Sequence, residues 1–263
     1  MKPIVETGIE QRSILAPLFA SHKHDRVLID SVLEGSFGSA WADSLSEPTV
    51  ARLDSGAFTL LGGDPGAAAA RTLLAVAPIS YVTPESHGWR QILQKAFGPT
   101  ISALRFTPFS WESLDEAYLA DLSQQLPAGF AVKRVDAALA ERLPADMGNV
   151  YFLECFHSVE DFLERGAGFC AIHGGKIVSA ASSAAASRYG IDIDIATVAE
   201  YRKRGLGMAV GARLVLHCLQ NGLEPHWLAA NADSERLAAR LGYRLEKPYE
   251  TFEIDPQPPV DSA

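Results

Sequence analysis

The segment Glu200–Gly207 contains three consecutive basic residues and two glycines, and a predicted helix begins inside it at about Leu206. The first turn of a helix leaves backbone N–H groups without partners and carries a partial positive charge. Glycines let an anion approach the backbone closely, and basic side chains add formal charge. The basic residues are Arg202, Lys203 and Arg204, and the glycines are Gly205 and Gly207. The segment therefore predicts an anion-binding site, with an ordinary solvated loop as the alternative.

Two common nucleotide-binding signatures are missing from the sequence. Neither GxxxxGK[ST] nor a GxGxxG after a strand occurs. This disfavours a nucleoside triphosphate or NAD as the anion.

The elements on either side of this segment are predicted with clear patterns. The strand Ile191–Ile195 alternates isoleucine and aspartate, which places Asp192 and Asp194 together on the polar face. The helix Leu206–Gln220 is apolar except for one polar stripe of Arg213, His217 and Gln220. A helix with so narrow a polar stripe is expected to pack deeply against a sheet.

The C-terminal elements, including the two just described, are predicted in the order β-α-α-β-β-β-α-β-α-β. Helix caps are expected at Ser158, with Asp161 in the first turn, and at the terminal glycines Gly166 and Gly242. The pair Gly174-Gly175 predicts a hairpin turn. Besides those already given, the predicted elements are the strands Phe130–Val135, Phe169–His173, Lys176–Ser183 and His226–Ala230, with helices at Ala137–Leu143, after Ser158 and before Gly242.

The N-terminal half is less distinctive and indicates an α+β domain. Short strands are predicted at Phe58–Leu61 and Leu73–Val76, and Ser113 with Glu116 predicts the start of a helix that ends near Leu126. The turn-forming residues at 124–129 indicate a linker. We therefore expect an N-terminal domain of residues 1–127 and a C-terminal domain of residues 128–263. The first domain is a candidate for binding the acceptor substrate.

Composition limits the classes of function. The 263 residues are 48% hydrophobic and 21% charged, which is typical of a globular protein long enough for two domains. No N-terminal signal and no membrane-spanning stretch are expected, which predicts a cytoplasmic protein. The net charge of −9 argues against nucleic acid or an anionic membrane as partner and is compatible with an amine substrate. Oligomer formation is left open.

The cysteines Cys155, Cys170 and Cys218 are odd in number and lack CxxC spacing. They predict buried, reduced thiols rather than disulfides. No metal site is expected, and the histidines at 157, 173, 217 and 226 have no spacing that suggests a triad or a metal centre.

The C-terminal motifs resemble the GNAT acetyltransferase superfamily, whose cofactor motif is a strand, (R/Q)xxGxG and a helix. The first motif matches at Arg202, Gly205 and Gly207, and a second matches at Asn231, Leu237, Gly242 and Tyr243. The whole chain is similar to the GNAT subgroup with an extra N-terminal domain, which includes zwittermicin A resistance-type proteins. The resemblance implies a GNAT fold, a mixed and mostly antiparallel sheet flanked by helices, and acetyl-CoA as co-substrate.

The resemblance also implies roles for individual residues. The pyrophosphate would bind the backbone from Arg204 to Met208, and the pantetheine would pair with the strand end at Thr197 and Val198. Asn231 would lie beside the pantetheine or the thioester, and a backbone N–H near Val198 would hold the thioester oxyanion. The implied cofactor residues are Thr197, Val198, Arg202, Lys203, Arg204, Gly205, Leu206, Gly207, Met208, Asn231 and Ser234. Ala238 stands where the family often has a tyrosine general acid.

A base would be useful, because an alkyl amine of pKa about 10.4 is almost entirely protonated at neutral pH. The candidates are Asp192, Asp194 and Glu200. The alternatives are that the aspartates face solvent or pair with an arginine, and that Glu200 is only a loop residue. The expected function is direct transfer of an acetyl group to an amine of a small molecule or peptide. A non-catalytic acyl-CoA-binding or regulatory module is the alternative.

Overall fold

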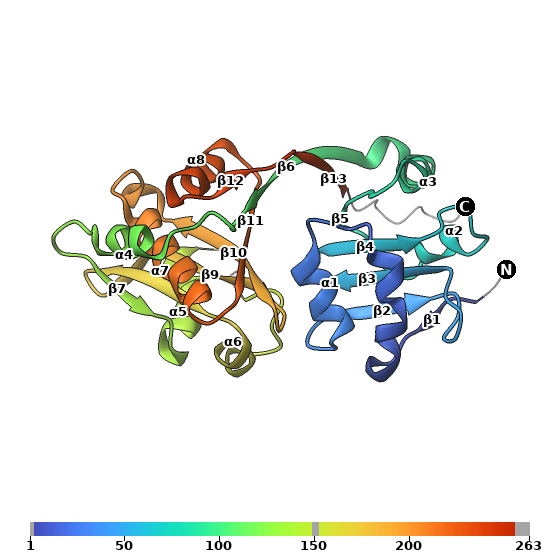
Figure 1. Cartoon of the computed structure of the whole chain (residues 1–263), viewed down its shortest axis with the longest axis horizontal. Coiled ribbons are helices and arrows are strands. Elements are labelled where there is room, and N and C mark those ends of the chain that lie inside the picture. Colours follow the sequence, from blue (N-terminus) through green and yellow to red (C-terminus); the bar gives the residue numbers. More distant parts are fainter. Residues whose placement is uncertain (1–2, 149–152, 256–263) are drawn as a thin grey trace. The chain divides into compact units, whose positions relative to one another are not determined.

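A computed structural model of the chain describes residues 3–148 and 153–255. The chain divides into two compact units, one of Met1–Phe106 with Pro248–Ala263 and the other of Thr107–Lys247. Figure 1 shows the elements of both units. No helix in the described ranges combines the length and the hydropathy that crossing a bilayer requires.

The sheet of the second unit has the strand order β6-β11-β10-β9-β8-β7, with β12 also paired to β6. Neighbouring strands are antiparallel except β10 and β11, which are parallel. The strands are β7 (Ala131–Arg134), β8 (Gly168–His173), β9 (Lys176–Ala186), β10 (Gly190–Thr197), β11 (Glu224–Ala229), β12 (Arg244–Leu245) and the part of β6 (Ile101–Ser110) from Thr107 onward. The prediction of a mixed, mostly antiparallel sheet is confirmed.

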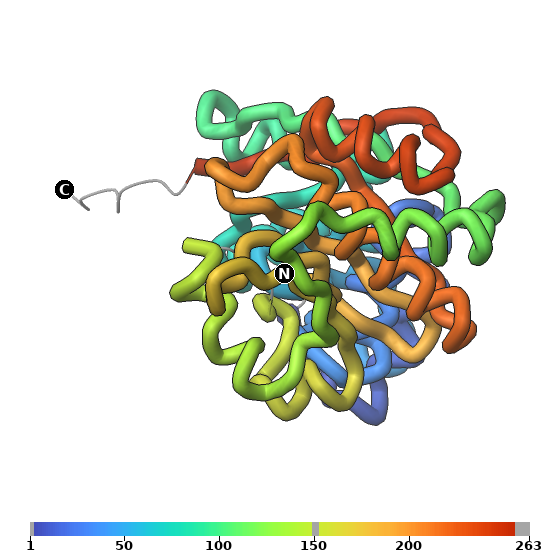
Figure 2. Tube along the Cα trace, turned by 90° about the vertical axis from the view of Figure 1, so that its left-hand side faces the viewer, coloured from blue at the N-terminus to red at the C-terminus, as the bar shows by residue number. Residues whose placement is uncertain are grey.

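Helices cover both faces of this sheet. The helices are α4 (Glu116–Gln124), α5 (Ala137–Met147), α6 (Val159–Arg165), α7 (Leu206–Gln220) and α8 (Ala232–Leu241), with a short 3-10 turn η3 (Ala199–Tyr201). Helix α4 packs beside α7, as the green and orange tubes in Figure 2 show. The order from β7 to β12 is the predicted one.

Helix α7 has the predicted bounds, and its polar stripe behaves as expected. Arg213 and Gln220 are exposed and His217 is half-buried, whereas ten other residues of the helix are buried. The hairpin at Gly174-Gly175 is also confirmed, because His173 pairs with Lys176 and both glycines have positive φ. Ser158 caps α6 by accepting a hydrogen bond from the Asp161 N–H.

Two predictions differ from the structure: the residue that begins helix α4 and the position of the domain boundary. Helix α4 is capped by Asp115, which accepts from the Tyr118 N–H at 2.8 Å, whereas the Ser113 hydroxyl donates to the Gly242 carbonyl. The boundary predicted between residues 127 and 128 lies inside the second compact unit. The physical reason is that Leu119 and Leu122 of α4 are buried in the same hydrophobic cluster as α7.

The strands of the first unit have the order β1-β2-β3-β4-β5-β13-β6, with β4 and β5 parallel. The strands are β1 (Val5–Glu6), β2 (Ser39–Ala42), β3 (Val50–Ser55), β4 (Phe58–Gly63), β5 (Tyr81–Val82), β13 (Tyr249–Ile254) and residues 101–106 of β6. The helices are η1 (Ile9–Phe19), α1 (Arg26–Leu33), α2 (Ala70–Leu73), α3 (His87–Phe97) and η2 (Gly98–Thr100). Phe58–Leu61 is a strand as predicted, but the strand predicted at Leu73–Val76 is wrong.

The segment around Leu73 is helical because tertiary contacts decide an ambiguous apolar run. Leu73 is buried in the core of the first unit. Its carbonyl accepts a hydrogen bond from the buried guanidinium of Arg52 at 3.1 Å. The same guanidinium also donates to the carbonyls of Ala77 and Pro78, so this turn is fixed by β3 rather than paired as a strand.

Candidate functional site

Helix α7 begins where the sequence predicts, directly after the basic turn. Gly205 is the N-cap residue, has a φ of +82° and offers no side-chain cap. The first hydrogen bond of the helix runs from the Ala209 N–H to the Gly205 carbonyl, so the three preceding N–H groups have no partner within the helix. The side chains of Leu206 and Met208 are buried in the core of the unit.

The three basic side chains lie around this turn and are exposed. Arg202 donates from Nε to the Thr197 carbonyl at 3.1 Å, and Arg204 donates to the Glu200 carbonyl at 3.1 Å. The Arg204 guanidinium also lies over the Tyr201 ring. Lys203 has a φ of 60°, a conformation that non-glycine residues rarely adopt outside functional or strained turns.

Strands β10 and β11 pair over only three residues and then part. Their parallel register joins Gly190 to Glu224, Ile191 to Pro225 and Asp192 to His226. Beyond Asp192, β10 remains paired with β9 as far as Thr197. In the described part of the chain, residues 193–197 therefore have no partner strand on the side that faces β11. This unpaired edge leads to the N-terminus of α7.

The backbone groups of Val198 at the end of this edge already have partners. The N–H of Val198 donates to the Val178 carbonyl at 3.0 Å, and the Val198 carbonyl accepts from the Tyr201 N–H at 2.9 Å. Val198 therefore cannot also offer its N–H to a thioester. Backbone groups alternate in direction along a strand, so the N–H groups of Ile195 and Thr197 face the unpaired side instead.

Asp194 lies beside the same edge. Its Oδ1 accepts the Ile195 N–H at 2.8 Å, and this N–H points to the unpaired side of β10. Burial raises the pKa of the Asp194 carboxyl, and the Ile195 hydrogen bond opposes that shift. A carboxylate with a raised pKa is a better proton acceptor near neutral pH.

Asp192 lies two residues before Asp194 on the strand and pairs with His226, a histidine whose sequence spacing suggested no site. Paired residues on neighbouring strands point to the same face, so His226 lies beside Asp192. The Nε2 of His226 is 3.0 Å from Glu224 Oε2, and its ring packs on Trp111 at 4.4 Å between centroids. Glu224 and His226 are two residues apart on a strand and so point to the same face, which is the sequence signal for this pair. By contrast, Glu200 is exposed in η3.

Residues in and near the second motif have contacts within the protein itself. Asn231 caps α8, its Oδ1 accepting the N–H groups of Asp233 and Ser234 at 3.1 and 3.0 Å. The Ser234 hydroxyl accepts the Trp227 Nε1–H at 3.1 Å. Ala238 is fully buried and carries no proton to donate. The predicted cofactor roles of Asn231 and Ser234 remain predictions.

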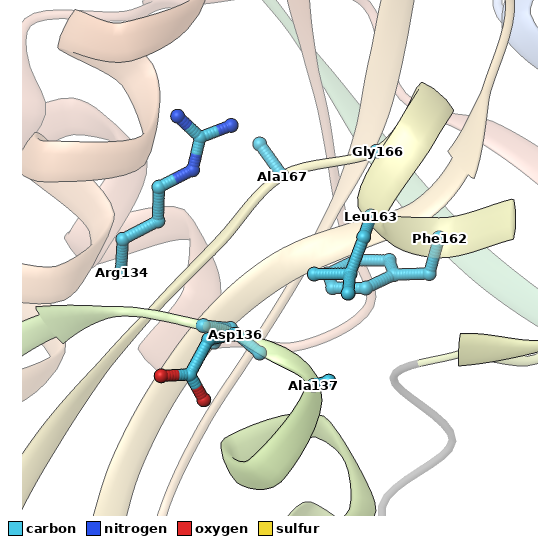
Figure 3. Close-up of a pocket in the computed structure, with 8 residues that line it drawn as sticks. Arg134, Asp136, Ala137, Phe162, Leu163, Gly166 and Ala167 are labelled. Carbon is cyan, nitrogen blue, oxygen red and sulfur yellow. The ribbon is translucent and has the colours of Figure 1, made fainter. Parts of the chain in front are cut away.

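A cavity of about 460 Å³ lies between the end of β7, the start of α5 and the end of α6 (Figure 3). Its lining includes Arg134, Asp136, Phe162 and Leu163. Asp136 caps α5 through the Leu139 N–H at 2.9 Å. None of the predicted site residues lines this cavity, so we place the candidate site at the β10 edge and not here.

The three cysteines are free and buried, as predicted. Burial raises the pKa of Cys170 to about 11 and that of Cys218 to about 12. Since the thiolate is the reactive form, these thiols are poor nucleophiles in the folded protein.

The chain is similar to a curated protein over part of its length. A curated relative, the uncharacterized N-acetyltransferase YdfB of Bacillus subtilis, is 30% identical over 169 residues, which cover 64% of this chain and 63% of the relative. The chain thus spans less than two thirds of that relative's length.

Solved structures extend the likeness to both units. A GCN5-related N-acetyltransferase-like protein from Streptococcus suis has a TM-score of 0.82 and 30% identity, covering 94% of this chain and all of that one. A GNAT-family acetyltransferase from Colwellia psychrerythraea shares the fold alone, with a TM-score of 0.56 and 11% identity over 96% of this chain and 100% of its own. The family model described as GNAT acetyltransferase matches residues 16–252. With that match over most of its length, the chain belongs to the GNAT acetyltransferase family.

Proposed function

We propose that this protein is an acetyl-CoA-dependent N-acetyltransferase that acts on an amine of a small molecule or peptide. The observation that carries the proposal is the parting of β10 and β11 after Asp192, at an edge that ends on the uncapped N-terminus of α7. An extended pantetheine arm fits an unpaired strand edge, and a pyrophosphate fits a helix N-terminus.

The chemistry is direct attack of the neutral amine on the thioester carbonyl. The new bond joins nitrogen to the acetyl carbon, the carbon–sulfur bond breaks, and the thiolate leaves and takes up a proton. The Thr197 N–H is the donor we assign to the developing oxyanion, because Asp194 holds the Ile195 N–H and Val178 holds the Val198 N–H. Asp194 accepts the amine proton, with Asp192 and its neighbour His226 as the second candidate.

The alternative is a module that binds acyl-CoA without catalysis. The buried Ala238 favours it, since the family's frequent tyrosine acid is missing there. The acid is dispensable for an enzyme of this kind, because a thiol has a pKa of about 8.5 and leaves with little protonation.

The anion site is tested by calorimetric titration of acetyl-CoA into Gly205→Asn and a matched control. A side chain at position 205 would meet no protein atom within 4 Å, but it would stand at the helix N-terminus. Asparagine tolerates positive φ better than other residues. The control is Gly222→Asn, because Gly222 also has positive φ with open space around it and lies past the other end of α7.

We expect Gly205→Asn to weaken acetyl-CoA by about 10-fold or more, corresponding to about 1.4 kcal/mol, and Gly222→Asn to bind like the wild type. Equal affinities in both folded variants would remove the proposed site. Turnover is then followed as free CoA thiol over a panel of polyamines, amino acids and short peptides. Binding without thiol release on any of these amines would support the non-catalytic module instead.

A further inference from the structure

Three ligand-type side chains converge in the first unit, away from every motif discussed above. His22 lies in the loop between η1 and α1, Asp25 lies directly before α1, and Glu85 lies in the loop between β5 and α3. The Nδ1 of His22 is 3.4 Å from Glu85 Oε1 and 3.8 Å from Asp25 Oδ2. One donor atom from each residue lies within 4.8 Å of the other two.

The hydrogen bonds leave the inner atoms of this cluster without partners. The Nε2 of His22 is 2.9 Å from the Leu61 carbonyl, which must accept, so Nε2 carries the proton and Nδ1 of the neutral ring has a free lone pair. The Tyr249 hydroxyl donates to Asp25 Oδ1 at 3.4 Å. Both His22 Nδ1 and Asp25 Oδ2 are buried with no hydrogen-bond partner among the described residues.

The Asp25 side chain does not cap helix α1, although its position would normally favour a cap. It is the N-cap residue of α1, where an aspartate usually accepts a hydrogen bond from the first turn, but its side chain makes no cap bond. The carboxylate points at His22 instead. The side chains of His22 and Asp25 are 1% and 2% exposed, and that of Glu85 is 16% exposed.

A buried acceptor without a donor, and a buried carboxylate without a counter-charge, are both costly. Three acceptor atoms that face one another need a positive species between them. Ligands at about 2.0 to 2.2 Å from a tetrahedral zinc ion lie about 3.4 Å apart, close to the two distances measured from His22 Nδ1. A ring nitrogen whose other N–H donates to a backbone carbonyl is the usual arrangement of a metal-binding histidine.

We propose that His22, Asp25 and Glu85 bind a divalent transition-metal cation, with Zn²⁺ as the best match. One imidazole nitrogen and two carboxylate oxygens suit zinc and its neighbours, whereas Mg²⁺ and Ca²⁺ prefer all-oxygen sites. Glu85 also lines a cavity of about 530 Å³ together with His24, Arg90, Arg105 and Tyr249. Of the three proposed ligands, Glu85 is the one that borders this cavity.

The test uses the full chain after treatment with a chelator. Zn²⁺ is titrated calorimetrically, and Co²⁺ is added separately because its visible absorption reports tetrahedral nitrogen and oxygen ligands. We expect one saturable site per chain. Asp25→Asn and Glu85→Gln keep the side-chain shape but remove a charged ligand, and each should weaken Zn²⁺ by about 10-fold or more. Circular dichroism establishes that each variant is folded.

The matched control is His87→Gln, because His87 is an exposed histidine of the same unit that contacts Gln91. It should bind Zn²⁺ like the wild type. The proposal is overturned if folded wild-type protein shows no saturable site, or if Asp25→Asn and Glu85→Gln bind Zn²⁺ as tightly as His87→Gln does. Either result would mean that a proton on His22 fills the cluster in place of a metal.

Discussion

Asp194 combines the position and the electrostatics that a general base needs. Its carboxylate holds the Ile195 N–H beside the unpaired edge of β10, and burial raises its pKa. The cost of keeping this group ionised is borne by the folded protein, because burial disfavours the charged form. Activity and stability should therefore respond to its replacement in opposite directions.

The first prediction concerns catalysis by Asp194→Asn. We expect kcat at neutral pH to fall by about 10²-fold, with partial recovery at high pH, where the amine is already neutral. The measurement is the pH–rate profile with any amine that supports thiol release. Asp161→Asn is the control, since Asp161 pairs with Arg165 in α6. An unchanged profile in Asp194→Asn would move the base to Asp192 or Glu200.

The second prediction concerns the stability of the same two variants. A carboxyl whose folded pKa is raised stabilises the fold fully only below its unfolded pKa of about 3.9, and this contribution is lost as pH rises through the folded pKa. Asp194→Asn should therefore melt above the wild type at neutral pH, and the difference should shrink as pH falls towards that value.

Asp161 should behave in the opposite way. Its hydrogen bond with Arg165 lowers the pKa of the Asp161 carboxyl. That contribution is present above the unfolded pKa and is lost as pH falls through the folded one. Asp161→Asn should therefore melt below the wild type at neutral pH, and its deficit should shrink in acid. Deficits of the same sign in both variants would contradict the assigned shift of Asp194.

At the scale of elements, Asn231 has an observed role as a helix cap and a predicted role beside the ligand. Its side-chain oxygen caps α8, which follows the parting strand β11. The cap positions the helix whose Leu237 and Leu241 pack near Gly207 and Gly211 of α7. A loss of acetyl-CoA binding in an Asn231 variant could therefore arise from the helix or from a lost contact.

The third prediction separates these two effects. Asn231→Ala should cost about 1 kcal/mol of stability, because alanine cannot cap. Asn231→Asp keeps the cap but removes the amide NH₂, so its stability should stay near that of the wild type, and so should its affinity for acetyl-CoA. Urea unfolding and calorimetric titration measure the two quantities. A 10-fold loss of affinity in a stable Asn231→Asp protein would show that the amide itself contacts the ligand.

At the scale of the whole molecule, two separate cores are assigned two different ligands. The candidate acetyl-CoA site lies in the unit Thr107–Lys247. The proposed cation site of His22, Asp25 and Glu85 lies in the other unit. A ligand that binds only the native state stabilises it by about 2.7 kcal/mol at 100 times its Kd. The stabilisation should be greatest in the segments around each site.

Hydrogen exchange followed by mass spectrometry is the measurement. We expect acetyl-CoA to slow exchange in β10, in the first turn of α7 and in β11. We expect Zn²⁺ to slow exchange around residues 22–29 and 83–86. Zn²⁺ protection confined to Thr107–Lys247, or acetyl-CoA protection absent from α7, would contradict this assignment of ligands to units.

The sequence by itself determined several local elements of the second unit. Helix α7, the strand before it, the glycine hairpin and the caps at Ser158 and Gly242 follow from periodicity, cap residues and positive-φ glycines, which act over a few neighbouring residues. The family motif then predicted the fold. Tertiary packing decided what these short-range signals do not contain: the membership of α4 in the second unit and the helix at Leu73.

The same distinction holds for the sites. The proposed anion site at Gly205 depends on local sequence, because a helix N-terminus and its basic turn are continuous in the chain. The engagement of the Val198 N–H by Val178 depends on the register with β9, and the place of His226 beside Asp192 depends on the register of β10 with β11. His22 and Asp25 are close in sequence, but Glu85 joins them only through the packing of two loops. A contact between residues so far apart leaves no periodic trace in the chain, and only the folded structure brings these charges together.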